Sequence, residues 1–274
     1  MKMLFLLRLS VVASLLGAAS AFASQPGECP APDEAAGMPA AMPKVAAALK
    51  PGGTLQVLAI GSATMFGPEA SLSPGTVTSQ ALSNGASSLR SPEIFNKEAS
   101  ERAFPRQMAK NLRALVPGAQ VEVTVRGGRG LPATDMLALM RTELAAKPYQ
   151  LVIWQTGTVE AVRNLPPNEF AQTLAEGLSV VEAANANLVL IDPQFSRFLQ
   201  TNSNLEPYSQ VLQQVASLPG VALFRRFDLM RSWANDGRID LERASRNERQ
   251  KVIDGLHACL GVHLARLVYD SGRL

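Results

Sequence analysis

Short apolar runs alternate with longer segments of helical periodicity from Thr54 onward, and this alternation restricts the fold more than any other feature of the sequence. Strands are predicted at 55–60, 121–125, 151–154, 188–191 and 221–224, and helices at 103–116, 134–146, 168–184 and from about 257 to 269. Strands that are apolar throughout and alternate with helices form parallel sheets that are covered on both faces. The sequence therefore predicts a three-layer α/β/α domain around a parallel sheet of about five strands with right-handed crossovers.

The amino terminus has the three parts of a secretory signal peptide. Basic residues come first, an apolar run covers 9–16, and the small-residue pattern of a cleavage site occupies 21–23. A membrane anchor needs about 20 consecutive apolar residues. Arg8 interrupts the apolar segment, so the uninterrupted run is too short for an anchor. We therefore expect cleavage after Ala23 and a mature protein that is periplasmic or secreted, without an integral membrane segment.

Composition excludes several classes of protein. The chain is 47% hydrophobic, which is too apolar for a disordered tail protein. Its net charge falls from +3 to +1 once Lys2 and Arg8 leave with the signal peptide, so no nucleic-acid partner is expected. Neither nucleotide-binding glycine spacing nor a metal-binding cluster of Cys, His and Asp occurs, and we expect no cofactor and no metal.

The mature chain divides into an amino-terminal extension, 24–53, and one domain, 54–274. A long segment rich in Ser, Gly, Pro and Thr, 68–98, interrupts this domain between the first strand and its helix. A loop of this length in a compact domain is usually functional or disordered. It is either a lid over the turn that follows the first strand or a loose surface insertion.

The two cysteines, Cys29 and Cys259, both survive signal cleavage. An even pair in an exported protein is a candidate disulfide, and the alternative is a buried free thiol in a helix. We favour the disulfide. It would hold the mature amino terminus close to His257, which lies two residues before Cys259.

Polar and glycine-rich segments follow the predicted strands. Ligand sites in open parallel sheets form at the carboxyl ends of the strands, where tight turns bring polar side chains together. The segments are 61–64, 126–130, 155–160 and 192–194, and a further polar segment, 254–257, leads into the last helix.

Taken in order, these segments resemble the sequence blocks of the SGNH/GDSL hydrolase family, whose small exported esterases have a flavodoxin-like sheet. The resemblance covers Leu55 to about Tyr269. Its firmest element is Asp254-Gly255-Leu256-His257, which resembles the family's closing Asp-x-x-His. A carboxylate three residues before an imidazole, on a loop that enters a helix, can accept from Nδ1–H and leave Nε2 free. The resemblance thus implies His257 as general base and Asp254 as its orienting residue.

Two other blocks imply parts of an oxyanion hole. The family's oxyanion glycine falls on Gly130, whose N–H can approach a developing oxyanion because no side chain stands in the way. In the next block the family has Gly-x-Asn-Asp, and this chain has Gly157-Thr158-Val159-Glu160. Val159 therefore replaces the side-chain amide that would complete the oxyanion hole.

The nucleophile block departs from the family as well. Alignment on Gly61 and Gly67 places Ser62 on the family's Asp and Ala63 on its serine nucleophile. Ser62 and Thr64 flank this alanine, and a shift of the turn could bring the Ser62 hydroxyl to His257. We therefore predict Ser62 as a displaced nucleophile, with Thr64 as the weaker alternative.

The resulting functional prediction is an exported ester hydrolase with an atypical or weakened active site. Its substrates would be small acyl or O-acetyl esters, including acylated glycans. The alternative is a carbohydrate- or acyl-binding protein that kept the pocket after losing its nucleophile. His263 lies inside the predicted last helix, where we expect a packing or surface role.

Overall fold

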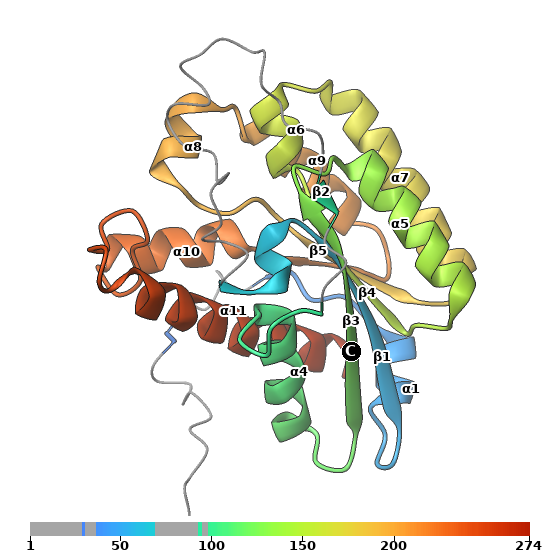
Figure 1. The fold of residues 1–274 in the computed structure, drawn as a ribbon. Coiled ribbons are helices and arrows are strands. Elements are labelled where there is room, and N and C mark those ends of the chain that lie inside the picture. The colour runs from blue at the N-terminus through green and yellow to red at the C-terminus, as the bar shows by residue number, and fades with distance from the viewer. Residues whose placement is uncertain (1–28, 31–36, 69–92, 95–97) are drawn as a thin grey trace, which may run out of the picture.

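A computed structural model describes residues 29–30, 37–68, 93–94 and 98–274 of the chain (Figure 1). The strands are β1 (Thr54–Gly61), β2 (Glu93–Ile94), β3 (Gln120–Arg129), β4 (Leu151–Gln155), β5 (Asn187–Ile191) and β6 (Val221–Phe224). They form one sheet in the order β2-β3-β1-β4-β5-β6. β2 pairs antiparallel with β3, and the other pairs are parallel. The predicted α/β/α fold with a parallel sheet of about five strands is confirmed.

Helices cover both faces of the sheet. They are α1 (Pro43–Ala48), α4 (Phe104–Leu115), α5 (Ala133–Ala146), α6 (Thr158–Arg163), α7 (Pro167–Ala183), α8 (Arg197–Asn202), α9 (Glu206–Ala216), α10 (Arg226–Asn235) and α11 (Arg249–Ser271), with a 3-10 turn, η2, at Ala63–Phe66. One core contains side chains of α1, α4, α10 and α11, and the other contains side chains of α5, α7, α8 and α9. In β1, Val57 and Ala59 belong to the first core, and Leu58 and Ile60 to the second. β4, β5 and β6 are almost entirely apolar because both of their faces are buried, whereas β3 alternates buried apolar with more exposed polar residues.

The order of the strands reverses at β1. The chain passes from β1 to β3 on one side of it and later to β4 on the other. Ligands of doubly wound sheets bind where this reversal occurs, at the carboxyl ends of the strands. The residues that follow β1 and β4 therefore meet at the place where a binding site is expected.

The last helix differs most from its prediction. It was expected to start at about His257, but α11 begins at Arg249 and runs unbroken to Ser271. Asp254 and His257 therefore both lie inside a helix, and the expectation that Asp254 lies on a loop entering it was wrong. The helix predicted at 168–184 corresponds to α7, which begins one residue earlier, at Pro167.

α11 packs beside α4 and is a helix of the core (Figure 1). Of the helices in the described segments, it alone is long and apolar enough to cross a membrane, but more than half of its most apolar window is buried inside the fold. Two of its side chains hold the amino-terminal segment. Cys259 forms a disulfide with Cys29, which confirms that prediction, and His263 Nε2 lies 2.7 Å from the Cys29 carbonyl oxygen.

Other predictions fall outside the described residues. The signal peptide at 1–23 is among them, as is nearly all of the expected lid or insertion at 68–98. Residues of the amino-terminal extension that are described contact the domain. Met38 forms an antiparallel bridge with Leu223 of β6, and the Trp233 indole donates a hydrogen bond to the Pro30 carbonyl at 2.6 Å.

Candidate functional site

Three polar side chains form a closed ring where β1 and β4 end. Ser62 follows the last residue of β1, Thr64 lies in η2, and Gln155 is the last residue of β4. Gln155 Nε2 lies 2.7 Å from Ser62 Oγ, Thr64 Oγ1 lies 3.0 Å from Gln155 Oε1, and the two hydroxyl oxygens are 3.1 Å apart. Gln155 is 3% exposed, whereas Ser62 and Thr64 are half-buried.

The ring determines where the Ser62 proton points. Gln155 Nε2 donates to Ser62 Oγ, and Thr64 donates to Gln155 Oε1. The Thr64 proton is thereby used, so the contact between the two hydroxyls is made by the proton of Ser62. Ser62 therefore directs its proton to Thr64, and within the described residues it makes no hydrogen bond to His257. The adjacent Ala63 side chain packs into the core.

His257 is buried on α11 and hydrogen-bonded through the nitrogen that was expected to face Asp254. The ring is 3% exposed, and its Nδ1 accepts a hydrogen bond from the Phe104 backbone N–H, at 3.1 Å. Nδ1 therefore carries no proton, and in the neutral ring the proton sits on Nε2. The predicted arrangement, with Nδ1–H donating to Asp254 and Nε2 free to accept, is contradicted by this geometry.

Asp254 is instead part of a surface ion pair. Its carboxylate accepts from Arg102 Nη1 at 2.9 and 3.1 Å and from Gln250 Nε2 at 3.0 Å, and its side chain is one-third exposed. The physical reason is the early start of α11. Both residues sit on a continuous helix, where Asp254 faces Arg102 while His257 enters the core.

Burial also keeps the His257 ring neutral. Its pKa is lowered from 6.5 to about 4, chiefly by desolvation and also by the positive charges of Arg226 and Arg102. The ring is therefore uncharged at neutral pH, with its only lone pair already occupied by the Phe104 N–H. It has no nitrogen that can take a proton from Ser62 in this arrangement.

The segments that the sequence assigned to an oxyanion hole, after β3 and β4, are hydrogen-bonded to each other. Glu160 is buried, and its carboxylate accepts from the Ala133 N–H at 2.5 Å and the Gly157 N–H at 3.0 Å. Burial raises the pKa of Glu160, and the two N–H donors oppose that rise. The Gly130 carbonyl accepts from Arg163 Nη2 at 2.9 Å. These bonds fix the turns after β3 and β4, while the oxyanion role of the Gly130 N–H stays a prediction.

Arg226 and Asp192 are buried ionisable groups that influence each other electrostatically, and the sequence did not indicate this. They follow β6 and β5 and are 2% and 8% exposed. Asp192 Oδ1 accepts from the Phe227 N–H at 2.9 Å, whereas Arg226 Nε and Nη2 have no hydrogen-bond partner among the described residues. Burial raises the pKa of Asp192 to about 7 and lowers that of Arg226 to about 10.

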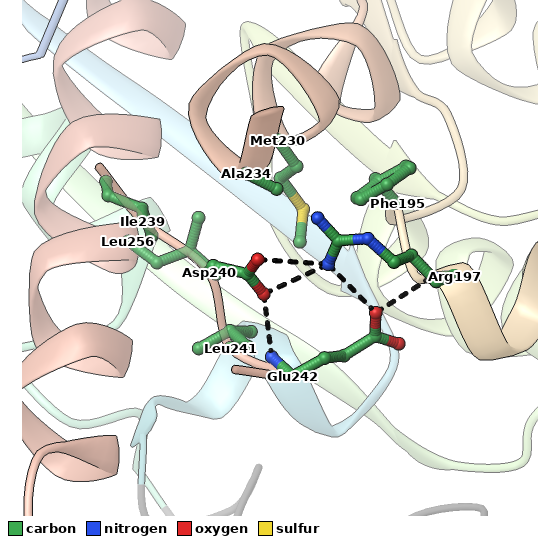
Figure 2. Close-up of a pocket in the computed structure, with 9 residues that line it drawn as sticks. All are labelled: Phe195, Arg197, Met230, Ala234, Ile239, Asp240, Leu241, Glu242 and Leu256. Carbon is green, nitrogen blue, oxygen red and sulfur yellow. Dashed lines mark hydrogen bonds and ion pairs between the residues drawn. The ribbon is translucent and has the colours of Figure 1, made fainter. Parts of the chain in front are cut away.

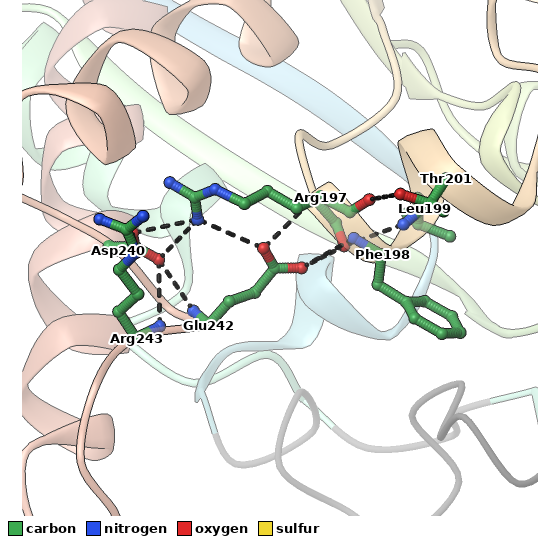
Figure 3. Close-up of polar contacts among 8 residues, drawn as sticks. Arg197, Phe198, Leu199, Thr201, Asp240, Glu242 and Arg243 are labelled. Atoms are coloured by element: carbon green, nitrogen blue, oxygen red, sulfur yellow. Dashed lines mark hydrogen bonds and ion pairs between the residues drawn. The ribbon is translucent and has the colours of Figure 1, made fainter.

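A second polar cluster closes a small cavity beside α10 (Figure 2). Arg197 Nη1 contacts the carboxylates of Asp240 and Glu242 at its rim. Glu242 also accepts from the backbone N–H groups of Arg197 and Phe198, which holds the loop after α10 to the start of α8 (Figure 3). The cavity measures about 20 Å³, enough for about one water molecule, so it is not a site for an ester substrate.

The pKa of His257 predicts a loss of stability in acid. Because the folded-state pKa of about 4 lies below 6.5, the unfolded chain binds the proton more tightly. The stabilisation is complete above pH 6.5 and is lost as the pH falls to 4. A His257→Gln variant can still accept from Phe104, so between pH 6.5 and 4 its free energy of unfolding should fall by about 3 kcal/mol less than that of the wild type. Urea unfolding across this range measures the difference.

Asp192 provides the opposing control. Its raised pKa of about 7 stabilises the fold below pH 3.8, and this contribution is lost as the pH rises to 7. Asp192→Asn should therefore remove a change of opposite sign to that removed by His257→Gln. Parallel pH profiles for the wild type and both variants would contradict the burial of these two groups.

Comparisons with known proteins agree with this fold. The model of the non-GDSL lipase-like family matches residues 28–273, and a search of curated proteins found no match. A lipase/acylhydrolase from Enterococcus faecalis is 16% identical, with a TM-score of 0.52 over 80% of this chain and 97% of that one. A variant of Axe2, an acetyl-xylooligosaccharide esterase from Geobacillus, is 13% identical, with a TM-score of 0.53 over 81% and 96%.

A third solved structure is larger than this chain. It is a two-domain esterase active on acetylated mannans, 12% identical, with a TM-score of 0.57 over 88% of this chain and 56% of that one. At these identities the structures show a shared fold.

In the described part of the chain, no group of three or more His, Cys, Asp or Glu side chains could hold a metal ion.

Proposed function

The chain belongs to the non-GDSL lipase-like family, among the SGNH/GDSL-like hydrolases, and we propose that it is an exported ester hydrolase with a weakened catalytic centre. One observation carries the proposal. The half-buried Ser62 hydroxyl stands at the carboxyl end of β1, with an amide donor 2.7 Å from its oxygen. A hydroxyl beside a fixed N–H donor, at the reversal of strand order, is the minimum that acyl transfer requires.

The proposed reaction passes through an acyl-enzyme. Ser62 loses its proton to hydroxide from solvent, and Oγ bonds to the ester carbonyl carbon while the carbonyl π electrons move to oxygen. The tetrahedral intermediate collapses, and the leaving group departs with the electrons of its bond to carbon. Water then hydrolyses the acyl-Ser62 ester, releasing the carboxylic acid and the serine.

The centre is weak because the described residues place neither a general base nor a general acid at Ser62. General acid–base catalysis contributes about 10²–10⁴-fold, and the His257 lone pair already accepts from Phe104. The rate should therefore rise with pH above 7 and depend steeply on the leaving group. Small acyl esters are the proposed substrates, with glycan O-acetyl esters turned over more slowly because an alkoxide leaves less readily. Esterases of acetylated sugars among the structural neighbours support this class.

Turnover of p-nitrophenyl acetate by the mature protein tests the proposal. Ser62→Ala should reduce the rate to that of heat-denatured protein, because it removes the nucleophile. His257→Gln should stay within about threefold of the wild type, and His263→Ala serves as the control on the same helix. Ethyl acetate should be hydrolysed far more slowly than the nitrophenyl ester. If a folded His257→Gln variant has no activity, His257 acts as the general base after all, as the sequence indicated.

The alternative is a non-catalytic protein that binds acylated carbohydrate on the same fold. The observation that favours it is the closed hydrogen-bond ring around Ser62, with Ala63 in place of the family's serine. Equal background hydrolysis by all variants, together with saturable binding of acetylated xylo-oligosaccharide, would establish this function. Export is tested separately, since the intact mass of the mature protein should correspond to a chain that starts at Ser24.

A further inference from the structure

Gln155 lies where a missing catalytic group is needed. The family places a side-chain amide at the position that Val159 occupies in this chain. We propose that Gln155 takes over this function and donates its Nε2–H to the negative charge that develops at Ser62 and on the substrate. The inference rests on the proposed ester hydrolysis and adds a catalytic residue to it.

The amide is in direct contact with the reacting atom. Gln155 Nε2 is 2.7 Å from Ser62 Oγ, a short distance for an N–H donor. Before attack, this bond stabilises the alkoxide form of Ser62, which matters in a centre without a base. After attack, the oxyanion is bonded to the carbon that Oγ has joined. A small rotation of the side chain then moves the same N–H from Oγ to the oxyanion.

Burial makes this donor effective. Gln155 is 3% exposed, so little water competes for its N–H. A preorganised donor in such surroundings contributes much more than one in solvent, and removal of one oxyanion donor typically costs about 10²–10³-fold in kcat. The geometry can therefore recover part of the loss caused by Val159.

Thr64 decides which end of the amide faces Ser62. Its hydroxyl donates to Gln155 Oε1 at 3.0 Å, so the NH₂ end must point to Ser62 Oγ. Thr64 is therefore a positioning residue that acts through Gln155. Gly61 makes room for this arrangement, because a Cβ at residue 61 would lie 2.8 Å from the Gln155 Cβ.

The chain offers a matched control at the other end of β4. Gln150 Oε1 accepts a hydrogen bond from the Gln56 N–H at 2.9 Å, so it also ties β4 to β1, but at the amino edge of the sheet. A Gln150→Ala variant loses a similar contact far from Ser62. It should leave kcat and KM for p-nitrophenyl acetate within about twofold of the wild type.

The test compares kcat and KM of the wild type with those of the Gln155 variants. Gln155→Ala should lower kcat about a hundredfold and change KM by less than about twofold, because the lost bond acts in the transition state. Gln155→Met keeps the volume of the side chain but lacks the N–H donor, and it should show the same loss of kcat. This variant replaces Gln155→Ala in the test if Gln155→Ala folds poorly. Thr64→Val should lower kcat, and Thr64→Ser should restore it. A trifluoromethyl ketone, which forms an oxyanion on Ser62, should bind about a hundredfold more weakly to both Gln155 variants.

The outcomes separate the two proposals. If wild-type turnover does not depend on Ser62, the hydrolase proposal and this inference both fail. If turnover depends on Ser62 but folded Gln155→Ala and Gln155→Met variants keep kcat within threefold, only the assignment of Gln155 is overturned. Equal losses in Gln150→Ala would likewise overturn it, because the effect would then be structural.

Discussion

Gly127→Ala is expected to destabilise the protein by at least about 4 kcal/mol, or to prevent folding. Gly127 is paired with Gly61 where β1 and β3 run side by side, and its φ is +136°. A Cβ at this position would come within van der Waals overlap of the Gly61 carbonyl oxygen, at 1.9 Å. Backbone atoms on both sides of the contact must then move, so the end of the β1–β3 ladder opens directly before Ser62.

Gly220→Ala is the control that separates the steric clash at residue 127 from the cost of placing alanine at a positive φ. Gly220 has a φ of +77°, but a Cβ there meets no atom within 4 Å. Its substitution should cost only the strain of a left-handed alanine, about 1 kcal/mol. Urea unfolding of both variants measures the difference. Similar losses in the two variants would mean that the close approach of β1 and β3 at this pair does not contribute.

Local sequence patterns were sufficient to predict the sheet. Most of the parallel strands are apolar runs, and runs such as 151–154 and 221–224 are buried on both faces, so hydrophobicity alone marks them. β3 instead alternates apolar and polar residues, because only one of its faces is buried along most of its length. The same rule placed the polar segments at one edge, because they follow the strands. β2 is only two residues long and pairs through its backbone with β3, and no pattern in the sequence indicates it.

Local patterns failed for α11, and with it for the predicted catalytic pair. Residues 249–256 carry several charges and a glycine, which favoured a loop. The structure nevertheless makes them helical, since Ile253 and Leu256 are buried. Tertiary packing of an apolar face outweighs a weak local propensity. A role for Asp254 as orienting residue depended on the loop, and it is lost once both residues lie on the helix.

Side-chain partners were the other limit of the sequence. Gln155 was within a segment identified as part of the site, but nothing in the sequence shows that its amide reaches Ser62 across two strands. Arg226 and Asp192 were likewise separated along the chain, by two helices and a strand. Such contacts depend on the register of neighbouring strands, which a single sequence does not define.

Reduction of the Cys29–Cys259 disulfide is expected to lower the free energy of unfolding by about 5 kcal/mol in the chain-entropy description. The two cysteines are 230 residues apart, so the bond closes a loop that includes almost the whole domain. Urea unfolding of the oxidised protein with and without dithiothreitol measures the effect. The Cys29→Ser/Cys259→Ser double variant should match the reduced protein and should not respond to the reductant. Equal unfolding midpoints for oxidised and reduced wild type would contradict the expected stabilisation.

A second variant distinguishes the cross-link from the contacts around it. Trp233 donates to the Pro30 carbonyl next to the disulfide, and Trp233→Phe removes this bond while keeping an aromatic ring in the core. Loss of one such hydrogen bond should cost about 1 kcal/mol, whether or not the disulfide is intact, if the bond forms independently. If the disulfide is what holds Pro30 against α10, the cost should instead disappear in the reduced protein. A double-mutant cycle that combines Trp233→Phe with the double serine variant measures this coupling. We expect the two contacts to be coupled, because residues 29 and 30 are adjacent.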